Sequence, residues 1–250
     1  MRIADEARLK FGARLRAWYR RNARDLPWRR TRDPYHILVS ELMLQQTQVS
    51  RVLEYYPRFL ARFPTLEALA GARARQVVSE WSGLGYYARA RNLHKLSRRV
   101  TRDGDGTLPS EPHALRELPG IGAYTAGAVA SFAHGKRAAL VDTNVARVLA
   151  RVFAPRLRPK RPRDLKRLWV IAEDTLPRTA NATWTHNQAL MELGALVCTA
   201  RARRCGICPV RGVCATYARE GPPEPGVAMR SVGAVVVATD GRPDRSSSRA

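Results

Sequence analysis

The chain has 250 residues, 45% of them hydrophobic, which suffices for one large or two small domains with real cores. It carries 44 Lys and Arg against 21 Asp and Glu, a formal net charge of +23. Such an excess predicts a polyanionic partner, nucleic acid before membrane. The N-terminus lacks the apolar region of a signal peptide, and no apolar run reaches membrane-spanning length. We expect a cytoplasmic monomer.

The stretch "LVSELMLQQTQVSRV" contains Glu41 between apolar neighbours, followed by the polar group Gln45 to Gln48. Glu is usually solvated, but a carboxyl in an apolar wall has a raised pKa and can be a general acid. The glutamines are predicted to open a helix. They could form a solvated turn of that helix, or bond base edges and fill a gap in a duplex. Both pairs of alternatives remain open from the residues alone.

The spacing of apolar residues predicts helices over most of the chain. Apolar residues recur three and four apart from Val49 to Phe63, including Val52, Leu53 and Phe59, and so predict one apolar helix face. Thr65 is a predicted N-cap of the next helix. A Gly-rich turn enters a helix at "SGLGYYARARNLHKL", residues 103–112 form a loop, and residues 165–175 and 187–197 predict two more helices.

The stretch "ELPGIGAYTAGAVASFA" predicts a helix, a tight turn and a second helix. Gly120 and Gly122 permit backbone angles and close approaches that a side chain would block. The amides that open the second helix favour an anion such as phosphate, although an ordinary interhelical turn has the same pattern. Asp142 stands just before another apolar-periodic helix, where an N-cap is the simpler interpretation.

The four cysteines follow the spacing C-x6-C-x2-C-x5-C and are Cys198, Cys205, Cys208 and Cys214. In a reducing compartment this pattern predicts a metal site rather than disulfides. Zinc and an iron–sulfur cubane both accept four thiolates, so the spacing leaves both open. Arg201, Arg203 and Arg204 lie in the loop between the first two cysteines and suit phosphates, unless they are simply solvated.

The C-terminal stretch changes character. "EGPPEPG" predicts a linker, Val232 to Gly241 a strand with a turn, and the last residues a polar tail. We expect residues 217–250 to be a linker with a truncated C-terminal stub. A natural short form, a shifted frame and a fragment would each explain such a stub.

Several stretches together resemble the adenine DNA glycosylases of the MutY type, which belong to the helix-hairpin-helix superfamily with endonuclease III. They occur in that family's order across residues 1–216, with the four-cysteine spacing, and read "LPWR", "PYHILVSELMLQQTQV", "GLGYYARARNLH", "LPGIGAYTAGAVASFA", "VDTNVARVLAR" and "NQALMELGALVCT". An ordered set of this kind is far more specific than one motif.

The resemblance implies an all-α, two-lobed fold. Residues 26–138 would form a six-helix barrel with the helix-hairpin-helix, and residues 1–25 with 139–216 a lobe that holds a [4Fe–4S] cluster. The implied cluster ligands are Cys198, Cys205, Cys208 and Cys214. The implied partner is double-stranded DNA in which adenine is mispaired with 8-oxoguanine or guanine.

The resemblance also implies site residues. Glu41 would protonate the departing adenine, Asp142 would oppose the positive charge on the sugar, and Asn144 would position water. The positions that match the adenine pocket are Trp28, Arg29, Gln188 and Glu192. The positions that match the duplex wedge and the contacts with the partner base are Gln46, Thr47, Leu84 and Tyr86.

Tyr124 separates two kinds of glycosylase. Endonuclease III-like relatives with lyase activity carry Lys at this position, and its amine forms a Schiff base with the sugar. Tyr has no amine, so the resemblance implies a monofunctional enzyme that leaves an abasic site. The alternatives are a pyrimidine or T:G mismatch glycosylase of the endonuclease III kind and a catalytically silent DNA-binding protein.

Overall fold

The computed structural model describes residues 3–222, and every regular element in that range is a helix. The expected all-α class is therefore confirmed. None of the helices within residues 3–222 is long and apolar enough to cross a membrane. The strand predicted from Val232 to Gly241 lies outside the described residues.

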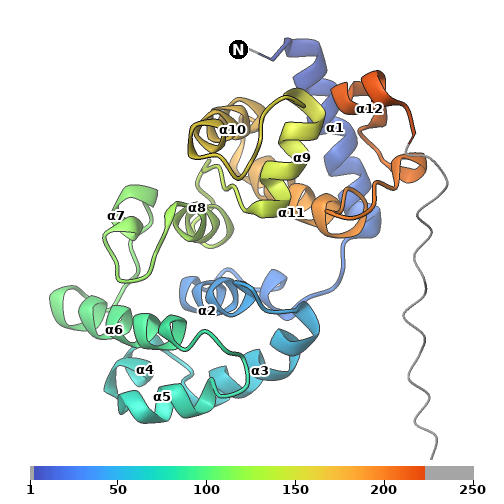
Figure 1. Ribbon diagram of the computed structural model, residues 1–250. Coiled ribbons are helices and arrows are strands. Elements are labelled where there is room, and N and C mark those ends of the chain that lie inside the picture. Colours follow the sequence, from blue (N-terminus) through green and yellow to red (C-terminus); the bar gives the residue numbers. More distant parts are fainter. Residues whose placement is uncertain (1–2, 223–250) are drawn as a thin grey trace, which may run out of the picture.

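The helices form two lobes with α8 between them (Figure 1). The first lobe is preceded by the short helix η1 (Pro27–Arg29). It comprises α2 (Pro34–Leu44), α3 (Val49–Arg62), α4 (Leu66–Gly71), α5 (Ala74–Glu80), α6 (Ala88–Asp103) and α7 (Pro112–Arg116). The second lobe comprises α1 (Asp5–Asn22), α9 (Thr143–Phe153), α10 (Pro162–Thr175), α11 (Ala180–Leu196), η2 (Cys205–Ile207), η3 (Arg211–Val213) and α12 (Ala215–Glu220). The predicted lobe end at residue 216 falls inside α12.

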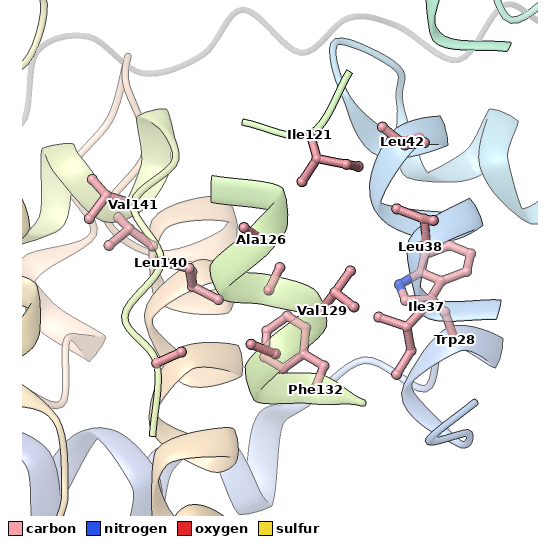
Figure 2. Close-up of a cluster of buried hydrophobic side chains, with 14 of the residues drawn as sticks. Trp28, Ile37, Leu38, Leu42, Ile121, Ala126, Val129, Phe132, Leu140 and Val141 are labelled. Carbon is pink, nitrogen blue, oxygen red and sulfur yellow. The ribbon is translucent and has the colours of Figure 1, made fainter. Parts of the chain in front are cut away.

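Helix α8 (Ala123–Phe132) joins the two lobes because it packs against α2 and α7 on one side and α11 on the other. Figure 2 shows Val129 of α8 facing Ile37 of α2, while Leu140 lies on the opposite side of α8. Gly127 lets the segment at Ala139 and Leu140 approach α8 closely, since a Cβ there would overlap the carbonyl oxygen of Ala139. This close approach fixes the segment that leads to Asp142.

Helix α2 carries Glu41 into the interior. Asp33 caps the helix by accepting from the backbone N–H of His36 at 3.0 Å, and Pro34 is its first residue. The helix is apolar on nearly all sides, and residues 37–43 are all buried. A helix of this composition lies in a core rather than on a surface. Burial of the apolar residues on either side of Glu41 therefore carries Glu41 into the interior.

The predicted apolar face of α3 is mostly correct. Val52, Tyr56 and Phe59 are buried, but Leu53 is 39% exposed and Tyr55 is buried in its place. Residues one apart on a helix point about 100° apart, so Leu53 falls off the edge of the stripe that Val52 and Phe59 define.

Two predicted N-caps are confirmed. Thr65 accepts from the backbone N–H of Ala68 at 3.2 Å at the start of α4. Asp142 accepts from the backbone N–H of Val145 at 2.7 Å at the start of α9. The predicted loop at residues 103–112 separates α6 from α7. The helices predicted at 165–175 and 187–197 are α10 and α11, and both begin earlier than predicted.

Candidate active site

Glu41 and Tyr124 meet between α2 and α8. The Tyr124 hydroxyl donates to Oε2 of Glu41 at 2.7 Å, and Glu41 is only 4% exposed. Burial raises the pKa of Glu41 to about 7; the hydrogen bond from Tyr124 and the charge of Arg29 oppose this rise, and the charge of Asp142 adds to it. The solvated alternative for Glu41 is therefore wrong. A carboxyl that keeps its proton near neutral pH is suited to general acid chemistry.

The turn before α8 positions Tyr124. Gly120 has a φ of +79°, the left-handed region that favours glycine, and a Cβ there would press on Asn92. Gly122 differs from the prediction, because its φ of −87° is open to any residue. A Cβ on Gly122 would meet nothing within 4 Å. The outer side of this turn is therefore open to the close approach of another molecule.

Asp142 is held by two hydrogen bonds and by the start of a helix. Besides the capping bond from Val145, its Oδ2 accepts from Nδ2 of Asn144 at 3.0 Å. The Oδ1 of Asn144 accepts from Nη2 of Arg147 at 2.8 Å, which fixes the orientation of the amide. Donors at a helix N-terminus stabilise a carboxylate. The capping and catalytic interpretations of Asp142 are thus compatible.

A second buried carboxyl, Glu192 on α11, lies among arginines. It is fully buried and accepts from Nε and the backbone N–H of Arg24 at 2.8 and 2.9 Å, and from Nη2 of Arg29 at 2.8 Å. Burial alone would raise the pKa of Glu192, but the hydrogen bonds from Arg24 and Arg29 outweigh it and lower the pKa to about 2. Glu192 is a permanent anion at neutral pH.

Arg29 links this anion to the first carboxyl. Its Nε donates to Oε1 of Gln188 at 2.9 Å, and its charge acts on Glu41. Trp28 stands apart from this network, packing edge-on against Tyr56 with ring centres 5.5 Å apart. Of the residues that match the adenine pocket, Arg29, Gln188 and Glu192 therefore form one hydrogen-bonded group. Trp28 packs separately against an aromatic ring. Arg24 was missed, because nothing distinguishes it within the basic run "RRNARDLPWRR".

The residues that match the wedge and the partner-base contacts occupy two turns. Gln46 and Thr47 lie in the turn from α2 to α3, and Leu84 and Tyr86 lie in the turn from α5 to α6. Gln46 and Tyr86 are exposed, Thr47 is half-buried and Leu84 is buried. The prediction that residues 45–48 open a helix is wrong: α3 begins only at Val49, because Gln46 has a left-handed φ of 56° that ends α2.

The cysteines gather at one end of the second lobe. One cavity is lined by all four of them, Cys198, Cys205, Cys208 and Cys214. Within residues 3–222, no three Cys, His, Asp or Glu side chains are arranged to hold a metal ion. Arg151 donates to Sγ of Cys198 at 3.2 Å. Of the predicted phosphate arginines, Arg203 pairs with Glu220 at 2.7 Å, while Arg201 and Arg204 are exposed.

The sequence of this chain is similar to those of known DNA repair proteins. Residues 39–173 match the sequence model of the HhH-GPD superfamily of base excision DNA repair proteins. The adenine DNA glycosylase of Mycobacterium tuberculosis is 44% identical over 222 residues, which cover 86% of this chain and 71% of that protein. The human adenine DNA glycosylase is 43% identical over 213 residues, which cover 82% of this chain. The chain spans 39% of the human protein's length.

A solved structure of a thermostable thymine-DNA glycosylase is also similar, with a TM-score of 0.79 and 32% identity, covering 86% of this chain and 98% of that one. The two adenine DNA glycosylases are thus more similar to this chain in sequence than the thymine-DNA glycosylase is. The superfamily match covers more than half of the chain, and the bacterial relative aligns over most of both proteins. The chain belongs to the adenine DNA glycosylase family of the HhH-GPD superfamily.

Proposed function

We propose that the protein removes adenine from double-stranded DNA where adenine is mispaired with 8-oxoguanine or guanine. The observation that carries the proposal is the buried, proton-holding Glu41, whose pKa the nearby Asp142 helps to raise, while hydrogen bonds from Val145 and Asn144 hold Asp142 in place. Two carboxyls kept in different protonation states serve acid and electrostatic roles in glycosidic hydrolysis. The similarity to adenine DNA glycosylases supports adenine as the base.

The reaction then follows from these groups. Adenine leaves the base stack to reach the pocket. Glu41 donates its proton to a ring nitrogen as the bond between base and sugar breaks, and the bonding electrons leave with adenine. Asp142 stabilises the positive charge on the sugar, and Asn144 positions the water that adds to it. The proton released by that water restores the acid.

We propose that Trp28, Arg29, Gln188 and Glu192 form the adenine pocket. The network supports this set because Glu192 is a fixed acceptor and Arg29 a fixed donor, and each is held by other side chains. A rigid arrangement of donors and acceptors favours one base over others. We further propose that Gln46 wedges into the duplex and Thr47 contacts the partner base, assisted by Leu84 and Tyr86, with Gly120 and Gly122 against a phosphate.

We also propose a [4Fe–4S] cluster on the four cysteines. All four thiols line one cavity, and four thiolates are a ligand set that such a cluster accepts. The similarity to adenine DNA glycosylases supports the cluster over zinc. When bound, the cluster would cross-link the segment from Cys198 to Cys214. We expect iron and a brown colour after anaerobic purification; stoichiometric zinc would contradict the cluster.

The decisive experiment offers the protein duplexes with A:8-oxoguanine, A:G, T:G and thymine glycol, followed by alkali. We expect strand breaks at adenine only, and only after alkali. Breaks at T:G or thymine glycol would favour an endonuclease III-like pyrimidine glycosylase. Binding without any breaks would favour the silent DNA-binding protein.

The single-function character rests on Tyr124 and has its own test. Borohydride added during the reaction traps any Schiff base between protein and DNA. We expect no trapped adduct with the protein as it stands. The variant Tyr124→Lys should form one, because the amine would lie in the position of the tyrosine hydroxyl beside Glu41. Efficient trapping without that substitution would contradict the proposal.

A further inference from the structure

Arg89, the second residue of α6, is a buried cation without an acid partner. It is 7% exposed, and among residues 3–222 no carboxylate forms a salt bridge with it. Burial lowers its pKa from the usual value. A buried charge of this kind is costly unless hydrogen bonds satisfy it. The hydrogen-bond acceptors of this guanidinium therefore indicate what Arg89 does.

Those acceptors belong to two separate turns. From the end of α2 and the turn that follows, Nη1 reaches the carbonyl oxygens of Leu42 and Met43, both at 2.8 Å, and that of Gln45. The first two belong to the last turn of α2, whose carbonyls have no partner within the helix. The guanidinium thus caps α2 and continues into the turn that contains Gln46 and Thr47.

The other side of the guanidinium holds the turn from α5 to α6. Nη2 donates to the carbonyl oxygens of Leu84 at 3.2 Å and Gly85 at 2.9 Å, and Nε donates to that of Tyr86 at 3.4 Å. Nη2 also donates to the hydroxyl of Thr47 at 3.1 Å. One planar group therefore bonds both turns at once, and five fixed donors suit such a junction better than an ammonium group does.

Both turns hold strained backbone. Gln46 has a φ of 56° and Tyr86 a φ of 47°, and they are the only non-glycine residues with positive φ within residues 3–222. A left-handed residue other than glycine is strained and persists only where its surroundings hold it. Arg89 bonds the carbonyl before Gln46 and the carbonyl of Tyr86 itself, and its guanidinium lies 5.5 Å from the Tyr86 ring centre.

We infer that Arg89 is the positioning residue that locks the two turns into one unit for reading the partner base. This rests on the proposed function, in which Gln46 wedges into the duplex and Thr47 contacts the partner base, assisted by Leu84 and Tyr86. The side chains of Gln46 and Tyr86 face solvent, while the carbonyl oxygens of Gln45 and Tyr86 accept from the same guanidinium. Arg89 itself touches no DNA in this scheme, because its donors are occupied within the protein.

The test compares Arg89→Lys and Arg89→Met with Arg98→Met. Arg98 is an exposed arginine of the same helix, so its loss controls for one positive charge. The first measurement is hydrogen exchange of the free protein. The amide of Thr47 bonds Leu44 at 3.4 Å and that of Leu84 bonds Trp81 at 3.1 Å, so both turns carry protected reporters. We expect both to exchange about ten-fold faster in the Arg89 variants, with α10 unchanged, as for loss of one charged hydrogen bond.

The second measurement is single-turnover excision opposite 8-oxoguanine and opposite guanine, at saturating enzyme. We expect the preference for 8-oxoguanine to fall about ten-fold in Arg89→Met, and less in Arg89→Lys, which keeps the charge but not the planar fork. Arg98→Met should keep the preference. A merely structural role would lower both rates together, so an unchanged ratio would overturn the inference. Equal exchange rates in all variants would overturn it as well.

The two proposals fail in different ways. If the unmodified protein releases no adenine, the proposed function fails, and the exchange experiment still tests whether Arg89 locks the two turns. If Arg89→Met does not fold, Arg89→Lys supplies the same comparison. If adenine is released but the Arg89 variants behave like Arg98→Met, the positioning role fails and the proposed function stands.

Discussion

Two buried glutamates, one on α2 and one on α11, have opposite ionisation. Glu41 and Glu192 are 4% and 0% exposed, and burial acts to raise the pKa of both. Glu41 has one neutral hydroxyl as its partner, and its pKa rises to about 7. Glu192 has two arginines, and its pKa falls to about 2. Burial alone does not decide protonation; the charge of the nearest donors does.

The largest expected effect comes from Glu41→Gln. An amide cannot donate the proton, although its shape is nearly that of the acid, so single-turnover adenine release should fall by about 100-fold or more. A gel-shift titration should show DNA binding retained. Excision near the unmodified rate would remove Glu41 from the role of general acid.

The same substitution at the other glutamate should act on stability. Glu192→Gln leaves Arg24 and Arg29 without their anion, and breaking a buried pair in this way costs about 3 kcal/mol. Glu41→Gln should change the free energy of unfolding by less than about 1 kcal/mol, since Glu41 favours its neutral form when folded. Urea unfolding of both variants measures the contrast. Equal losses would show that the two sites do not differ as described.

The pH dependence should also differ between the two sites. The pKa of Glu41 is raised, so its contribution to stability is present below about pH 4.5 and is lost as the pH rises through 7. The pKa of Glu192 is lowered, so its contribution is present above about pH 4.5 and is lost as the pH falls through 2. Excision should decline about ten-fold per pH unit above pH 7. A rate that stays level to pH 9 would contradict this.

The smallest effect is expected from Tyr124→Phe. The Tyr124 hydroxyl lowers the pKa of Glu41 against the effect of burial, so its removal should move the descending limb of the pH–rate profile upward by about one unit or less. The rate at pH 6 should change little. A downward shift would mean that the hydroxyl does not stabilise the carboxylate form.

Sequence patterns reach far into this fold, because helices and caps depend on neighbours in the chain. The mostly helical character, the Thr65 and Asp142 caps and the loop at residues 103–112 follow from local spacing. Leu53 and the turn at residues 45–48 were misjudged, since a stripe's edge and a left-handed Gln46 depend on what packs around them. The spacing of apolar residues predicts that a helix forms, but it does not predict at which residue the helix ends.

The site shows the same division more sharply. The residues alone left Glu41 open between a solvated side chain and an acid, and the family resemblance singled it out. Its environment comes from α8, 83 positions along the chain, whose Tyr124 supplies the hydrogen bond. Arg24 and Arg89 are two arginines among many in a chain with +23 net charge. Only tertiary structure places Arg24 against the buried Glu192 and buries Arg89 against two turns. The sequence by itself determined the helices and the kinds of chemistry present, because both follow from residue type and local spacing. Packing decided which charges lost their water and which partners replaced it, because those contacts join residues far apart in the chain.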